Sequence, residues 1–212
     1  MINVLGRVMK GILLAGGSGS RLSPVTDVVN KHLLPIYDRP MAFYPLSTII
    51  SAGIKEILVI STTEDLPIYS KLLGDGSNLG ISINYAPQPS PDGIAQAFII
   101  AEEFIGDEPV TLILGDNVFT GEEVVDKLKY AIENVGSGAA IFGFPVKDPE
   151  RFGVAEIDEG GELVAIIEKP ETPPSNLAIA GLYVYGRGVF ERAKSLAPSE
   201  RGELEITDLN SM

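Results

Sequence analysis

Short apolar segments alternate with helical patterns over the first part of the chain, and this order limits the fold more than any other feature. Four short runs have the composition of buried strands; they lie at residues 8–15, 56–61, 81–85 and 110–114. Segments with helical spacing of apolar residues lie between or after them, at residues 40–53, 64–73, 93–105 and 122–134. Strands that alternate with helices form βαβ units, so this region predicts a mostly parallel sheet covered by helices.

The pattern changes after Gly136, where strands follow one another with little helix between them. We expect strands at residues 139–145, 153–157, 163–168 and 178–185. Asp158–Gly161 has the composition of a hairpin turn. A helix at residues 189–196 and the start of another at 203–210 complete the pattern. Because no long linker interrupts the chain, we predict a single α/β domain over residues 1–212, with a mixed, mainly parallel sheet.

The composition is that of a globular protein, and it excludes several kinds of chemistry. Of the 212 residues, 45% are hydrophobic and 21% are charged, which is ordinary for a folded domain. The chain has no Cys and one His, so it lacks disulfides, cysteine-based metal sites, thiol nucleophiles and multi-histidine metal centres. The net charge of −13 argues against non-specific nucleic-acid or anionic-membrane partners, but it permits a local basic pocket.

No segment predicts membrane insertion or export. The longest apolar runs, such as residues 11–17 and 110–115, are far shorter than the roughly 18 residues of a membrane-spanning helix. Residues 1–10 lack the long apolar region of a signal peptide. We therefore expect a cytoplasmic protein.

A glycine-rich loop follows the first predicted strand, with the sequence Leu-Ala-Gly-Gly-Ser-Gly-Ser-Arg-Leu over residues 14–22. Backbone N–H groups exposed by glycine can face phosphate oxygens, and Arg21 adds a planar, bidentate donor. The loop is neither a dinucleotide fingerprint, which needs Gly in place of Leu22, nor a P-loop, which closes on Gly-Lys. Taken alone, it is equally consistent with a tight strand-exit loop carrying a solvated Arg.

Several motifs in the same order resemble the sugar-1-phosphate nucleotidyltransferase family. Leu14–Leu22 is similar to its signature loop, and Asn30–Tyr37 is similar to its second signature. Further segments resemble the family's glucose-1-phosphate thymidylyltransferase branch; they are Gln88–Gly93, Leu114–Asn117, Glu168–Pro170 and Gly202–Asp208. The resemblance implies a Rossmann-like, three-layer nucleotide-diphospho-sugar transferase fold. It divides the domain into a nucleotide-binding half at about 8–135 and a sugar-binding half at about 136–212.

The resemblance also assigns a nucleotide site. Its residues come from the two signatures, the loop after the third strand and the end of the fourth strand; they are Gly16, Gly17, Gly19, Ser20, Arg21, Lys31, His32, Gln88, Gly93 and Asp116. Arg21 and Lys31 are placed on the nucleotide phosphates, where cations offset charge on leaving pyrophosphate. His32 stands where relatives commonly carry Gln, and a partly buried, hydrogen-bonded side chain is an equally good interpretation of it.

Physical arguments support three of these assignments, each with a plainer alternative. Gln88 offers a donor and an acceptor that match the edge of a pyrimidine base, and Gly93 lets a backbone group approach that base; the alternative is a rigid Pro-rich connection. Asp116 follows a buried strand at the sheet edge where ligands bind. A carboxylate there can hold Mg²⁺, which is the expected cofactor; the alternative is a turn-forming or helix-capping Asp.

The second half supplies the predicted sugar-phosphate site. The resemblance places Asn117, Gly153, Glu168, Lys169 and the backbone of Ile179 against the sugar and its phosphate. Glu168 can accept hydrogen bonds from vicinal hydroxyl groups, and Lys169 can bind the phosphate. Without the neighbouring motif, Glu168 and Lys169 would be interpreted as a weak surface ion pair.

The implied reaction is nucleotidyl transfer with dTTP and glucose 1-phosphate as partners. A phosphate oxygen of the sugar attacks the α-phosphorus of dTTP in line, and pyrophosphate leaves. Arg21, Lys31 and Lys169 are the expected catalytic residues, because they screen the repulsion between two anions. Two alternatives remain: a non-catalytic or weakly active nucleotide-binding homologue, and an enzyme that uses UTP or another hexose 1-phosphate.

Members of the family extend beyond the position that matches Met212. The resemblance places a Trp-containing motif with a second metal carboxylate there, together with helices that contribute to homo-oligomer contacts. This chain contains no Trp. We therefore expect lower activity than in complete relatives, and a homo-oligomer is the macromolecular partner that the resemblance implies.

Overall fold

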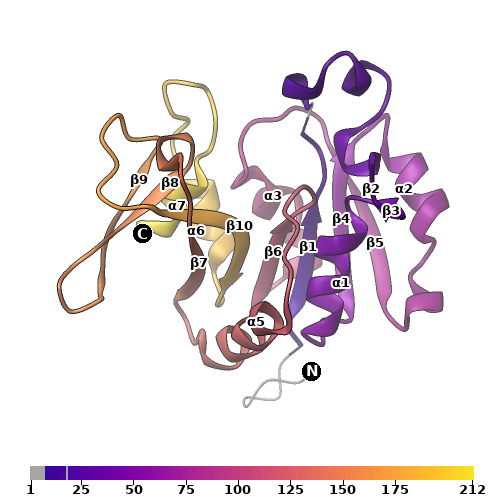
Figure 1. Cartoon of the computed structure of the whole chain (residues 1–212). Coiled ribbons are helices and arrows are strands. Elements are labelled where there is room, and N and C mark those ends of the chain that lie inside the picture. The colour runs from indigo at the N-terminus through magenta and orange to yellow at the C-terminus, as the bar shows by residue number, and fades with distance from the viewer. Residues whose placement is uncertain (1–7, 18) are drawn as a thin grey trace.

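The computed structural model describes residues 8–17 and 19–212 (Figure 1). Residues 1–7, which belong to the segment that we expected to lack an export signal, and Ser18 of the glycine-rich loop lie outside the described residues. Among the described residues, no helix is long and apolar enough to cross a membrane.

One eight-stranded sheet organises the molecule, in the order β5-β4-β1-β6-β10-β8-β9, with β7 paired to β10. The parallel strands are β1 (Lys10–Leu14), β4 (Glu56–Thr62), β5 (Ser82–Gln88) and β6 (Val110–Leu114). The antiparallel strands are β7 (Ala139–Pro145), β8 (Gly153–Ile157), β9 (Leu163–Glu168) and β10 (Leu177–Tyr185). Figure 1 shows the parallel strands on the right and the antiparallel strands on the left. The predicted mixed sheet is confirmed.

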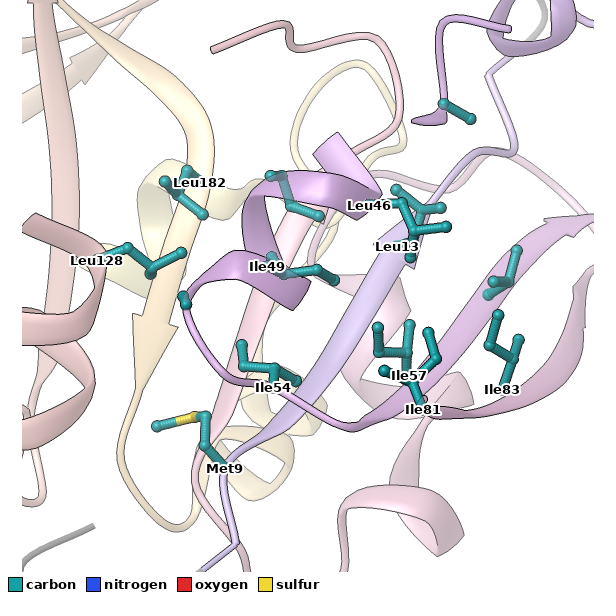
Figure 2. Packing of buried hydrophobic residues seen from close by; sticks show 14 of the residues in the cluster. Met9, Leu13, Leu46, Ile49, Ile54, Ile57, Ile81, Ile83, Leu128 and Leu182 are labelled. Carbon is teal, nitrogen blue, oxygen red and sulfur yellow. The ribbon is translucent and has the colours of Figure 1, made fainter. Parts of the chain in front are cut away.

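Helices cover both faces of this sheet, and the side chains of β1 show why. Leu13 packs into one apolar cluster, together with residues of α1 (Phe43–Ser51), α2 (Leu66–Leu73) and α5 (Glu122–Asn134), part of which Figure 2 shows. Ile12 and Leu14 point to the other face. The cluster there includes residues of α3 (Gln96–Ile100), α4 (Glu102–Ile105), α6 (Val189–Ser195) and α7 (Ile206–Asn210). This alternation along an extended strand produces three layers.

Three expectations about local structure need correction. The single helix expected over residues 93–105 is two short helices, α3 and α4, which meet at Ala101. The helix expected over residues 203–210 begins at Ile206. A small hairpin of β2 (Pro35–Ile36) and β3 (Arg39–Pro40) occupies the start of the helix expected over residues 40–53, so α1 begins later, at Phe43.

The two halves of the sheet meet at β6 and β10, which pair antiparallel from Val110 opposite Tyr185 to Ile113 opposite Leu182. β10 also pairs with β7 and β8, and its register with β7 shifts between Ile179 and Tyr183. Ligands of open α/β sheets bind at the carboxyl ends of parallel strands. The junction beyond the end of β6 is therefore where a functional site is expected.

Candidate functional site

A pocket of about 570 Å³ opens beyond the end of β6, between the parallel and antiparallel halves. It collects predicted residues from both halves of the chain; they are Arg21, Asp116, Asn117, Gly153, Glu168, Lys169 and Ile179. Residues that are distant in the sequence thus share one cavity. The sugar-phosphate residues proposed from sequence lie together on this cavity's wall.

Asp116 connects this pocket to the glycine-rich loop. Its Oδ2 atom lies 2.5 Å from Lys31 Nζ, and its Oδ1 atom accepts a hydrogen bond of 2.9 Å from Asn117 Nδ2. Burial would raise the pKa of Asp116, but the hydrogen bond and positive charge of Lys31 outweigh burial and hold the pKa below its usual value. Asp116 is therefore an ionised carboxylate at neutral pH.

The side chain of Asn117, the neighbour of Asp116, is held in place by strand β10. Asn117 Oδ1 accepts a hydrogen bond of 3.0 Å from the Gly181 N–H, where β10 passes the end of β6. A Cβ atom on Gly181 would lie 2.5 Å from the side chain of Leu114. Glycine at this position therefore lets β10 approach the residues that carry Asp116.

A second group of predicted residues surrounds the glycine-rich loop. A Cβ atom on Gly17 would lie 3.5 Å from Lys31 Nζ, and one on Gly16 would lie 2.0 Å from Gln88 Oε1. Gly16, Gly17, Lys31 and Gln88 are thus brought together, and the pair of Lys31 with Asp116 joins them to the pocket. A side chain at position 16 would therefore force the Gln88 amide to move.

His32 is buried beneath this loop, with 3% of its surface exposed. Burial lowers the pKa of His32 to about 4, so the imidazole is neutral at neutral pH. Its Nδ1 atom lies 2.7 Å from Asn30 Oδ1, which also accepts a hydrogen bond from the His32 backbone N–H. Asn30 Nδ2 donates to Ala15 O and to Asp65 Oδ2, so the Asn30 amide is oriented. His32 Nδ1 therefore carries the proton.

Glu168 is the centre of a charged cluster on the pocket wall. Its Oε2 atom accepts a hydrogen bond of 2.7 Å from Thr207 Oγ1. Its Oε1 atom lies 3.3 Å from both Lys169 Nζ and Arg201 Nη2. Arg201 in turn donates to both carboxylate oxygens of the buried Glu205 at 2.8 Å.

Arg201 and Thr207 were not predicted as site residues, although both line the pocket. Arg201 directly precedes the motif Gly202–Asp208, and Thr207 lies within it. A pocket that handles phosphate groups needs cations, so an Arg beside a recognised motif was the available signal. The distance of this segment from the other site residues along the chain concealed the contact.

The remaining predicted residues lie at the edges of this arrangement. Gly19 has a φ of +65° and accepts a hydrogen bond from Thr26 Oγ1 through its carbonyl oxygen, and Ser20 is exposed at the start of a 3₁₀ turn, Ser20–Leu22. A Cβ atom on Gly93 would lie 2.4 Å from the Leu204 carbonyl oxygen. The close approach that requires glycine at position 93 is therefore to the chain's own backbone.

Comparisons with known proteins find similar proteins over most of the chain. The model of the nucleotidyl transferase family matches residues 10–212. A glucose-1-phosphate thymidylyltransferase of Neisseria meningitidis is 57% identical over 204 residues, which are 96% of this chain and 70% of that protein. A glucose-1-phosphate thymidylyltransferase of Xanthomonas campestris is 53% identical over 201 residues, which are 95% of this chain and 68% of that protein.

A solved structure is also similar. It is described as a glucose-1-phosphate thymidylyltransferase of Bacillus anthracis in complex with sucrose. The two folds superpose with a TM-score of 0.88 at 42% sequence identity, covering 96% of this chain and 82% of the other. The predicted three-layer fold is confirmed by this similarity.

Proposed function

Because this chain belongs to the nucleotidyl transferase family, and within it to the glucose-1-phosphate thymidylyltransferases, we propose that its pocket carries out the reaction for which these relatives are named. The enzyme transfers a thymidylyl group from dTTP to glucose 1-phosphate, which yields dTDP-glucose and pyrophosphate. The observation that carries the proposal is the position of Asp116, which touches Lys31 beside the glycine-rich loop and also lines the pocket.

The chemistry needs positioning and charge compensation rather than a protein nucleophile. An oxygen of the sugar phosphate attacks the α-phosphorus of dTTP, the bond to pyrophosphate breaks, and no covalent enzyme intermediate forms. Two anions must come together, so cations are the groups that lower the barrier. Arg21 and Lys169 face the pocket and Lys31 adjoins it. An acidic protein can thus hold anionic substrates, because the charges that matter are local.

The two ends of the proposed site have distinct tasks. We assign the nucleotide to the side of Gly16, Gly17 and Gln88, which lie close to Lys31 or to one another. We assign the sugar phosphate to the side of Glu168 and Lys169, which line the pocket. Glu168 can accept hydrogen bonds from sugar hydroxyl groups. Arg201 holds the carboxylate of Glu168 from one side and adds a further cation to the pocket.

A divalent metal ion belongs to this proposal, with Asp116 as its protein ligand. Asp116 supplies one carboxylate to the pocket, and a single carboxylate fits an ion that takes its other ligands from phosphate oxygens and water. Mg²⁺ is held in this way by one or two carboxylates. When bound, the ion would supply positive charge for the phosphate groups.

The test is pyrophosphate release from dTTP and glucose 1-phosphate in the presence of Mg²⁺. We expect Asp116→Asn to lower kcat/KM by about 100-fold or more, because it removes the charged end of the pair with Lys31. The matched control is Asp126→Asn, which makes the same substitution on the exposed face of α5. Equal rates for both variants would contradict the proposal.

The alternatives are separated in the same assay. Binding of dTTP without pyrophosphate release by the unaltered protein would favour a binding module over an enzyme. A panel of UTP and other hexose 1-phosphates decides substrate choice. We expect dTTP with glucose 1-phosphate to give the highest kcat/KM.

A further inference from the structure

The amide group of Gln88 is held at one end by a chain of hydrogen bonds. Gln88 is the last residue of β5 and is buried. Its Nε2 atom donates to Gln96 Oε1 at 2.8 Å, and Gln96 Nε2 donates to Asp92 Oδ2 at 2.8 Å. Ser90 Oγ also donates to Asp92 Oδ2. The three side chains of Asp92, Gln96 and Gln88 form a relay, in this order.

The relay has a fixed direction because it begins at a carboxylate. A carboxylate can only accept hydrogen bonds, so Gln96 must turn its NH₂ group toward Asp92. The amide oxygen of Gln96 then faces Gln88, which must turn its own NH₂ group toward Gln96. Gln88 Oε1 is left at the opposite end, beside Gly16. Within the part of the chain that the structure describes, no side chain donates a hydrogen bond to this oxygen.

Backbone contacts keep the start of the relay in place. The Leu204 N–H donates to the Asp92 carbonyl oxygen at 2.7 Å, and the Asp92 N–H donates to Ser90 O at 3.0 Å. Gly93 packs directly on the Leu204 backbone. Asp92 is therefore fixed to the segment that also contributes Glu203 and Glu205 to the pocket.

We propose that Asp92 and Gln96 are positioning residues that make Gln88 present a hydrogen-bond acceptor to the nucleotide base. This inference rests on the proposed function, in which Gln88 faces the pyrimidine. Thymine and uracil carry a ring N–H donor, whereas the same ring nitrogen of cytosine is an acceptor. An oriented acceptor binds the first two bases and leaves an unpaired polar group opposite cytosine. The relay thus selects bases with a ring N–H over cytosine.

Two substitutions of Gln96 give opposite predictions. Glu at position 96 can only accept from Gln88 Nε2, so Gln96→Glu keeps the direction of the Gln88 amide. Lys at position 96 can only donate, so Gln96→Lys turns the amide and places its NH₂ group at the base. If the contact between Gln96 and Gln88 only stabilised the fold, Gln96→Glu and Gln96→Lys would not differ in base selectivity.

The experiment measures Kd for dTTP and dCTP by calorimetry, and kcat/KM for both with glucose 1-phosphate, in the complete chain. We expect the unaltered protein to prefer dTTP by about 100-fold or more. Gln96→Glu should keep this ratio within about threefold, while Gln96→Lys should lower it at least about tenfold. Asp92→Asn, which no longer fixes the direction, should give an intermediate ratio. Circular dichroism checks that each variant folds.

The outcomes separate this inference from the proposed function. Absence of pyrophosphate release by the unaltered protein, with the Kd ratios as expected, would reject the proposed function and leave the relay supported. An unchanged dTTP-to-dCTP ratio in Gln96→Lys would overturn the relay. If Gln96→Lys does not fold, an unchanged ratio in Asp92→Asn would overturn it. An unaltered protein that does not distinguish the two nucleotides would overturn it as well.

Discussion

At the scale of single residues, the lack of a side chain at Gly16 leaves room for the Gln88 amide in the proposed nucleotide site. A Cβ atom at this position would lie 2.0 Å from Gln88 Oε1, while one at Gly17 would lie 3.4 Å from the nearest atom of Lys31. We expect Gly16→Ala to displace the Gln88 amide and to raise KM for dTTP about tenfold, which is the loss of one hydrogen bond. Gly138→Ala is the matched control, because this exposed glycine lies outside the proposed nucleotide site and a Cβ atom there would lie 3.7 Å from the nearest atom. Equal effects on KM would contradict the argument.

His32 makes the stability of the protein depend on pH. Its pKa is about 4 in the folded protein because burial disfavours the charged form, and about 6.5 in the unfolded chain. Between these values the unfolded state binds more protons, so the free energy of unfolding falls as the pH falls. From pH 8 to pH 5 the loss attributable to His32 is about 2 kcal/mol. Urea unfolding at both pH values should show this loss in the unaltered protein and not in His32→Gln. Identical pH dependence in the two proteins would refute it.

Several residues predicted from the sequence line the pocket, but the contacts between them could not be predicted. Asp116 was predicted from its position after a buried strand, and the structure adds the contact with Lys31. The approach of Gly93 to the base stays a prediction, and the structure adds the close packing of Gly93 on Leu204. Arg201 was missed because its contact with Glu168 joins two segments that no local pattern relates. Sequence motifs therefore indicate which residues belong to the site, whereas the contacts among them depend on packing between segments far apart in the chain.

At the scale of elements, the strands were predicted more closely than the helices. Strand β6 has apolar residues at four of its five positions and lies between Pro109 and Gly115, so its limits are visible in the sequence. Residues 93–105 have a continuous apolar pattern, and both α3 and α4 pack on the same cluster. The pattern therefore gives no sign of the break at Ala101. The β2–β3 hairpin is too short to leave a periodic pattern.

The loop before α3 packs closely on the backbone of a distant segment. Gly93 has a φ of +102°, and a Cβ atom there would lie 2.6 Å from Leu204 N as well as 2.4 Å from its carbonyl oxygen. Gly93→Ala therefore combines backbone strain with a collision, and we expect it to lower the free energy of unfolding by more than about 3 kcal/mol. Gly80 is the control for backbone strain alone, because it has a φ of +70° and open space around it. We expect Gly80→Ala to lower the free energy of unfolding by about 1–2 kcal/mol. Urea unfolding of both variants measures the difference, and equal losses would contradict the collision.

At the scale of the whole molecule, the order of the strands could not be predicted from the sequence. The alternation of strands and helices indicated the parallel half, because each helix must cross back over the sheet. The position of β10 beside β6, with β7 and β8 both paired to it, depends on contacts between segments far apart in the chain. The pocket lies at this junction, so strand order decides where the two sets of site residues meet.

The pairing of β6 with β10 implies that the parallel and antiparallel halves unfold together. Leu182 of β10 lies opposite Ile113 of β6, is fully buried, and packs in the cluster that contains Leu13 of β1. Leu182→Ala would leave a cavity in contact with both halves, and we expect it to lower the free energy of unfolding by about 2–5 kcal/mol. Since the sheet is continuous, hydrogen exchange followed by mass spectrometry should show similar losses of protection in peptides from β1 and from β7. Loss confined to β7, with β1 still protected as in the unaltered protein, would mean that the halves unfold separately and that the junction at the pocket can open without the parallel sheet.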